Sequence, residues 1–214
     1  MKYQIVKKDK TNYSTSAWSG GATTEIQIMP EGSRYADRDF LWRLSSATVE
    51  VEESTFTALP DYDRLIMMLE GEMDLCHNNG PWIHLAEFVP HAFDGGDETL
   101  SRGRVTDFNL MLRKGKSRGE IVPMVFACDS READTSADSV KMTSETLLPE
   151  LKSCRDCMIY CHCGSLYITM EDGGKLELDA GKSLMMSGDF SDAKWTFCGE
   201  GGVRAVLAAV WNIA

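Results

Sequence analysis

The sequence predicts an all-β protein made of two small jelly-roll-like barrels. Short apolar runs that alternate with polar residues recur along most of the 214 residues, and glycine-containing turns separate several of them. Patterns with helical periodicity are scarce. Barrels and jelly rolls are built from many short strands, so this pattern favours them. The length suits two barrels of about 100 residues each.

Strand-like segments occupy the first half of the chain. The clearest is residues 40–51, where alternation places Phe40 and Trp42 on one face and Arg43 and Ser45 on the other. Such a strand presents one apolar face and one mixed face. The expected strands of this half are 40–51, 64–69, 72–76 and 107–112, with turns at Glu70-Gly71 and 78–81.

A polar stretch precedes a second set of strands. Residues 128–144 are rich in Asp, Ser, Thr and Ala, which is typical of a linker or an exposed loop. Residues 143–153 can hold one short helix, with Thr143 or Ser144 as its cap. The strands expected after it are 158–163, 165–170, 175–178, 183–186, 195–198 and 204–211, with turns at Gly164 and 171–174.

The two halves resemble each other. Residues 67–75 and 160–168 each read as strand, glycine turn and strand, and the offset from Gly71 to Gly164 is 93 residues. Self-similarity at this spacing indicates a duplicated β-domain. The expected domains are an N-terminal barrel over 1–125, an acidic linker or loop over 126–145, and a second barrel over 146–214 to which N-terminal strands are a candidate addition.

The charge of the chain disfavours several classes of partner. Lys and Arg number 22 against 33 Asp and Glu, which gives a formal net charge of −11. An acidic surface repels nucleic-acid phosphates and anionic lipids, and no apolar run approaches the roughly 20 residues that span a bilayer. The basic start, Met1 to Lys8, lacks the apolar run of a signal peptide. We therefore expect a cytoplasmic protein whose seven cysteines are free thiols.

Five motifs then point to one known family. They occur in the family's order and spacing, across residues 18–111. Together they resemble the HutD/Ves family of bicupins. The motifs are W-S-G-G-A-T-T-E at 18–25, W-R-L-S-S-A at 42–47, F-T-A-L-P-D-Y-D-R at 56–64, F-D-G-G at 93–96 and D-F-N-L-M at 107–111.

The resemblance carries expectations about fold and role. It implies a bicupin with a small-ligand pocket in the N-terminal barrel. HutD members are associated with histidine-utilisation operons, where a regulatory role has been proposed, and Ves members with stress responses; no catalytic activity is established for the family. This chain departs from the usual pattern in having no Asn between Trp18 and Gly20, Asp61 where Gly is usual, and a varied F-x-G-D element at 93–96.

Four polar residues stand out because they lie in strand-like settings with apolar neighbours. A buried arginine needs an anion, and its planar fork suits a carboxylate. One interpretation is a pocket for a small carboxylate; the alternative is an internal salt-bridge network, such as Arg43 or Arg64 with Asp107 or Glu25, that only fixes the fold. The candidate ligand-binding residues are Arg43, Arg64, Asp107 and Asn109, with further hydrogen bonds from Thr23, Glu25 and Ser45.

Histidines are few and do not have the spacing of a cupin metal centre. Such a centre needs His-x-His followed by Glu and His from later strands, and this chain has no His-x-His. His77, His84 and His91 are expected to be surface or loop residues, and the second half has only His162. We therefore expect no bound metal and no other cofactor.

The cysteines cluster in the second half. Cys154 and Cys157 form a C-x-x-C, and Cys161 and Cys163 follow on one face of a strand. Three interpretations stay open: small apolar residues in the second core, a zinc site, or redox chemistry.

The expected function is a non-enzymatic bicupin that binds a small carboxylate metabolite. The resemblance implies a regulatory or metabolite-buffering role in amino-acid (histidine) utilisation. Replacing Arg43 by alanine is expected to abolish binding. The alternatives are a cupin enzyme, an isomerase or a dioxygenase acting on a small acid, and a structural homodimer in which cupin sheets pair. The chain contains no G-x-S-x-G nucleophile motif.

Overall fold

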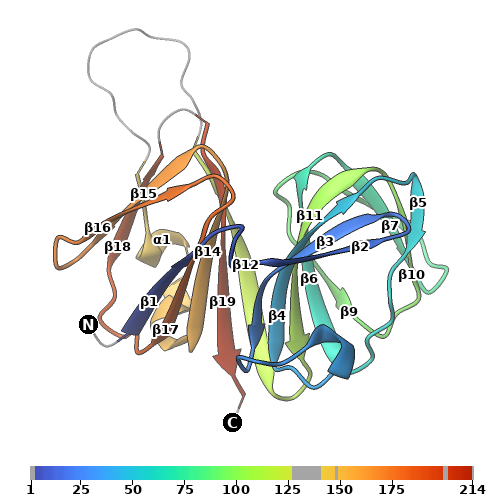
Figure 1. Cartoon of the computed structure of the whole chain (residues 1–214), viewed down its shortest axis with the longest axis horizontal. Helices are drawn as coiled ribbons and strands as arrows, with labels where there is room; N and C mark the ends of the chain where they lie inside the picture. Colours follow the sequence, from blue (N-terminus) through green and yellow to red (C-terminus); the bar gives the residue numbers. More distant parts are fainter. Residues whose placement is uncertain (1–2, 127–140, 148, 200–201, 214) are drawn as a thin grey trace, which may run out of the picture. The chain divides into compact units, whose positions relative to one another are not determined.

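The computed structural model describes residues 3–126, 141–147, 149–199 and 202–213. The described part of the chain forms two compact units, each built from two antiparallel sheets (Figure 1). The N-terminal unit comprises Asn12–Gly119 with Asn212–Ala214, and the C-terminal unit comprises Met1–Thr11 with Glu120–Trp211. The all-β fold class is confirmed. None of the described helices is long and apolar enough to cross a membrane.

The N-terminal unit has a six-stranded sheet in the order β2-β3-β4-β11-β6-β9 and a four-stranded sheet in the order β5-β10-β7-β8. A short 3-10 turn, η1 (Tyr35–Asp37), lies between β3 and β4 in the chain. The strands are β2 (Ser14–Trp18), β3 (Gly21–Met29), β4 (Trp42–Val49), β5 (Glu53–Thr55), β6 (Tyr62–Glu70), β7 (Met73–His77), β8 (Trp82–Leu85), β9 (His91–Asp94), β10 (Thr99–Arg102) and β11 (Val105–Arg113).

The C-terminal unit has a five-stranded sheet in the order β1-β17-β14-β19-β12 and a four-stranded sheet in the order β13-β18-β15-β16. The expected short helix is present as α1 (Ser144–Leu147) followed by the 3-10 helix η2 (Pro149–Ser153), and the Thr143 hydroxyl accepts a hydrogen bond from the Thr146 amide at 3.3 Å. The strands are β1 (Tyr3–Lys8), β12 (Ser117–Val125), β13 (Lys141–Thr143), β14 (Asp156–Cys163), β15 (Ser165–Met170), β16 (Lys175–Asp179), β17 (Ser183–Gly188), β18 (Trp195–Gly199) and β19 (Arg204–Asn212).

The two units share one topology. Adding eight to the strand numbers turns the order β5-β10-β7-β8 into β13-β18-β15-β16, and turns β4-β11-β6-β9 into β12-β19-β14-β17. Gly71 and Gly164 occupy equivalent turns, with φ of 79° and 78°. In each unit this turn carries the chain from the larger sheet to the smaller one. The repeat expected from these glycines is thus present in the backbone.

The boundaries of the units differ from those expected from the sequence. β1 belongs to the C-terminal unit because it pairs with β17, from Tyr3 opposite Gly188 to Lys8 opposite Ser183. Most of β12 also belongs there, beside β19. β1 is thus the N-terminal strand that the sequence analysis considered as an addition to the second barrel, whereas residues 120–125 lie outside the expected barrel over 1–125. Most of the expected acidic linker, residues 127–140, lies outside the described residues.

Apolar side chains fill the C-terminal unit, and three cysteines are among them. Cys154, Cys157 and Cys161 are buried in its core, and burial raises the pKa of all three thiols. Cys163 is exposed, which corrects the expectation that it shares a face with Cys161. The reason is a register shift in the β14–β19 pairing between Cys161 and Cys163. The buried thiols behave as small apolar residues.

The turn at Gly71 generates a prediction about stability. A Cβ at Gly71 would lie 2.8 Å from the Arg104 carbonyl oxygen, at a φ that side chains disfavour. Gly115 has a similar φ of 68° but nothing within 4 Å of a Cβ. We expect Gly71→Ala to lower the free energy of unfolding by about 2–4 kcal/mol and Gly115→Ala by about 1 kcal/mol. Urea unfolding followed by tryptophan fluorescence measures both, and equal losses would contradict the close approach.

Candidate functional site

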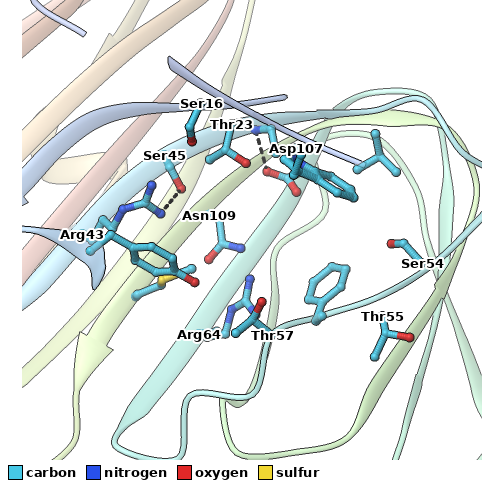
Figure 2. Close-up of a pocket in the computed structure, with 16 residues that line it drawn as sticks. Ser16, Thr23, Arg43, Ser45, Ser54, Thr55, Thr57, Arg64, Asp107 and Asn109 are labelled. Atoms are coloured by element: carbon cyan, nitrogen blue, oxygen red, sulfur yellow. Dashed lines mark hydrogen bonds between the residues drawn. The ribbon is translucent and has the colours of Figure 1, made fainter. Parts of the chain in front are cut away.

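A cavity of about 290 Å³ lies in the N-terminal unit. Its charged side chains and its amide come from one face of the larger sheet, and the segment Ser54–Thr57 and Tyr35 of η1 complete the lining. Figure 2 shows the labelled polar side chains around a common space. Six of the seven residues expected from the sequence line it: Thr23, Arg43, Ser45, Arg64, Asp107 and Asn109.

Strand register brings these residues together. On the central strand β11, Asn109 lies opposite Ser45 of β4, while Met111 lies opposite both Arg43 of β4 and Arg64 of β6. Residues two apart on a strand share a face, so these positions all point to the same side of the sheet. The sequence places the residues on strands, and the pairing of β4, β11 and β6 makes them one site.

Arg43 is fully engaged by its neighbours. Its Nε donates to Glu25 Oε2 at 2.7 Å, and its Nη1 donates to Ser45 Oγ at 2.9 Å. Its guanidinium also lies 4.4 Å from the centre of the Tyr35 ring. Glu25 lies opposite Ser45, which shares a face of β4 with Arg43, just before a register shift in the β3–β4 pairing. The structural ion pair considered in the sequence analysis therefore exists for Arg43 with Glu25.

Arg64, unlike Arg43, has no carboxylate of the described residues bonded to its guanidinium. Its relative exposure is 6%, its Nε has no hydrogen-bond partner, and no acceptor within the described part of the chain bonds its guanidinium. The group lies between two aromatic rings, 4.8 Å from the centre of Phe56 and 5.1 Å from that of Phe93. Burial lowers the pKa of Arg64 to about 10, so the side chain remains a cation at neutral pH. The site therefore contains a buried positive charge without a bonded anion.

Asp107 and Asn109 lie beside this charge, on β11. Asp107 Oδ1 accepts one hydrogen bond, from the Ala47 amide at 3.1 Å. Burial raises the pKa of Asp107 to about 6, although the charges of Arg64 and Arg43 act in the opposite direction. The Oδ1 atom of Asn109 is buried and has no hydrogen-bond partner. The cavity wall thus offers a cation, a titratable carboxyl group and an unpaired amide.

Aromatic residues that the sequence analysis did not select also line the cavity. They are Trp18, Tyr35 and Phe56. The ring of Trp18 packs over Gly20, where a Cβ would lie 2.3 Å from it, which explains the small residue at this point of the first motif. Trp18 and Phe56 were inside recognised motifs and could have been chosen, whereas Tyr35 carried no signal. The site combines charged groups with flat apolar walls.

Two of the histidines expected on the surface or in loops lie instead on strands and are half-buried. His77 Nε2 and His91 Nε2 are 3.0 Å apart, and both rings pack near Phe93, with centroids at 4.8 and 5.9 Å. Burial lowers the pKa of both imidazoles. His84 is exposed and pairs with Asp74, as expected for a surface residue. Nowhere among the described residues do three His, Cys, Asp or Glu side chains gather in a way that could hold a metal ion.

The C-terminal unit carries apolar residues at the equivalent positions. The 93-residue offset aligns Arg64 with Cys157. Asp107 lies opposite Met68, as Ala205 lies opposite Cys161 in the other unit. Asn109 lies opposite Ile66, as Leu207 lies opposite Ile159. Cys157, Ala205 and Leu207 are buried members of the C-terminal core, so the same topology encloses a polar cavity in one unit and a filled core in the other.

The Arg43–Glu25 pair should stabilise the N-terminal unit. Removing one charge leaves the other poorly compensated in a mostly buried setting. We expect Glu25→Gln to lower the free energy of unfolding by about 1–3 kcal/mol. The matched control is Glu53→Gln, which breaks an exposed pair with Arg102 and should cost less than about 0.5 kcal/mol. Equal effects in urea unfolding would show that the buried pair does not act as described.

The raised pKa of Asp107 predicts a pH-dependent effect of Asp107→Asn. The pKa is about 6 in the folded protein and about 3.9 in an unfolded chain, so the folded state holds the proton more tightly. The ionised carboxylate thus destabilises the protein above pH 6, by about 3 kcal/mol, and this penalty disappears as the pH falls toward 4. We expect Asp107→Asn to be more stable than the wild type at pH 8 and similar to it at pH 4.

The control for this experiment is Asp94→Asn. Lys114 holds the pKa of Asp94 below its usual value, so the ionised carboxylate stabilises the folded protein. Asp94→Asn should therefore be less stable than the wild type at pH 8. Free energies of unfolding at pH 4, 6 and 8 measure both variants. A difference between Asp107→Asn and wild type that does not change with pH would contradict the burial of an ionisable Asp107.

Known structures share this fold over their whole length. A conserved protein of unknown function from Pseudomonas aeruginosa PAO1, PA5104, has a TM-score of 0.77 and 19% identity, covering 97% of this chain and 99% of its own. HutD from Pseudomonas fluorescens SBW25, in a formate condition, has a TM-score of 0.71 and 20% identity over 99% and 100% of the two chains. The pirin YhhW from Escherichia coli, in complex with nickel(II), has a TM-score of 0.60 and 8% identity over 99% and 100%.

These similarities confirm the bicupin fold expected from the sequence. No curated protein matches the sequence. The family model named HutD matches residues 10–205, which is most of the chain. The chain therefore belongs to the HutD family.

Proposed function

We propose that the N-terminal unit binds a small carboxylate and that the protein is a non-enzymatic, regulatory or metabolite-buffering component of histidine utilisation. The observation that carries the proposal is the buried guanidinium of Arg64, which faces the cavity without a bonded anion. The planar fork of arginine matches the two oxygens of a carboxylate. The unpaired Oδ1 of Asn109 lies on the same wall and accepts hydrogen bonds only, so it suits a donor group elsewhere on the acid.

Energetics favour a ligand over a structural role for Arg64. Removing a charged group from water costs several kcal/mol unless an anion and hydrogen bonds compensate it. The rings of Phe56 and Phe93 give partial compensation only. Arg43, by contrast, is already satisfied by Glu25 and Ser45. The main anchor for the ligand is therefore Arg64, and Arg43, which the sequence analysis favoured, has a supporting position.

The cavity sets limits on the ligand. Its volume of about 290 Å³ is at the lower end for small-molecule sites, which suits a metabolite. Trp18, Tyr35 and Phe56 provide apolar walls for the body of the acid. The related HutD structure from Pseudomonas fluorescens is described in a formate condition, and formate is the smallest carboxylate. Formate is therefore a suitable minimal probe for this chain.

Replacing Arg64 by methionine separates the two interpretations of the site. If Arg64 serves a ligand, Arg64→Met should raise the free energy of unfolding by about 1–4 kcal/mol, because it removes an uncompensated buried charge. The same variant should lose at least tenfold in affinity for carboxylates, since a charge-assisted bidentate contact contributes more than about 1.4 kcal/mol. If Arg64 fixes the fold, the variant should instead be destabilised.

The measurements are urea unfolding and calorimetric titration with formate and a panel of small acids that includes intermediates of histidine breakdown. Arg102→Met is the matched control, because Arg102 is exposed, stacks on Trp82 and lies outside the cavity. It should bind the acids like the wild type. A wild type that binds no carboxylate, or an Arg64→Met variant with unchanged affinity, would contradict the proposed function.

A further inference from the structure

We infer that a carboxylate entering the cavity takes up one proton from solvent at Asp107, which then donates a hydrogen bond to the ligand. This inference rests on the proposed carboxylate site and concerns its regulation by pH. The step forms no covalent bond: the proton comes from the buffer and leaves again when the ligand dissociates.

The positions along β11 place Asp107 close enough to a bound carboxylate to be affected by its negative charge. Met111 lies opposite Arg64, and Asn109 and Asp107 follow at two-residue intervals on the same face. A carboxylate bonded to Arg64 lies in the same cavity as Asp107, whose charge interacts with that of Arg64, and Figure 2 shows both side chains at this cavity. Asp107 is only 4% exposed, so water screens this approach poorly.

Asp107 has few interactions that hold its negative charge. Its one hydrogen bond comes from the Ala47 amide, and neither Arg43 nor Arg64 bonds to it. The charge of Arg64 favours the ionised form of Asp107 from a distance. A bound carboxylate would neutralise that charge and add a negative one. Two carboxylates that share a buried site do not both stay ionised, so one of them gains a proton.

Other charged groups face Asp107 from the neighbouring strands. Arg43 from β4 is paired with Glu25 from β3, and Arg64 lies on β6. Behind Arg64, the Phe93 ring contacts His77 and His91. Burial lowers the pKa of both histidines, which favours their neutral form. Asp107 is therefore the group expected to change its protonation on binding.

The test is calorimetric titration of the full chain with formate, at pH 6.5, 7.2 and 8.0, in two buffers of different ionisation enthalpy. We expect the Kd of the wild type to rise about tenfold per pH unit and the buffer dependence to report uptake of nearly one proton. In Asp107→Asn the side-chain oxygen can still accept the hydrogen bond from the Ala47 amide, and the side-chain NH2 group can donate a hydrogen bond to the ligand at every pH. This variant should show no proton uptake, a pH-independent Kd, and tighter binding than the wild type at pH 8.

The matched control is Asp63→Asn, which removes the same charge from an exposed position on β6 and should keep the wild-type pH dependence. A wild-type Kd that is constant from pH 6.5 to 8 without proton uptake would overturn the inference and leave the carboxylate site standing. Proton uptake that persists in Asp107→Asn would also overturn it, because another group would then be responsible. If formate binds at none of these pH values, both the proposed function and the inference are overturned.

Discussion

The unpaired, buried charge of Arg64 is the constraint on which the arrangement of the N-terminal unit depends. A barrel of this size normally closes around apolar side chains. Here the larger sheet instead turns a cation, a carboxyl group and an amide toward one space. The neighbouring cation, Arg43, is paired with Glu25, which leaves Arg64 as the cation without a bonded anion. Two phenyl rings shield that group without bonding to it. This arrangement supports the proposed anion site.

The C-terminal unit has the same topology but no buried charge at the position equivalent to Arg64. Its sheets repeat the strand order of the N-terminal unit, and its glycine turn has the same backbone conformation. Where the site has Arg64, Asp107 and Asn109, the core has Cys157, Ala205 and Leu207. The topology therefore does not require the polar residues. Burying polar groups without full hydrogen bonding is expected to cost stability, which is the pattern of residues that serve binding rather than folding.

The sequence was sufficient for the strands that bury one apolar face, such as 40–51 and 107–112, and for the candidate residues on them. It predicted no strand at the positions of β2, β3, β5, β8, β9, β10, β12 and β13. Among these, β2 and β8 have mostly exposed side chains and lack the alternation that sequence patterns detect. It identified both Arg43 and Arg64 as candidates, because only the contacts of the folded chain show that Glu25 bonds to Arg43 and not to Arg64. Long-range contacts thus decided between these two residues, and strand pairing placed β1 beside β17.

The net charge of the chain affects how an anion would approach the cavity. The chain carries a formal net charge of −11, so its long-range field repels an anionic ligand, whereas the cavity attracts it at short range. Salt screens the first effect strongly and the second weakly, because the contacts with Arg64 are buried. Under the proposed function, the ligand is an acid whose apolar body fits among Trp18, Tyr35 and Phe56. Its selection would depend on shape and desolvation inside the cavity rather than on charge attraction from outside.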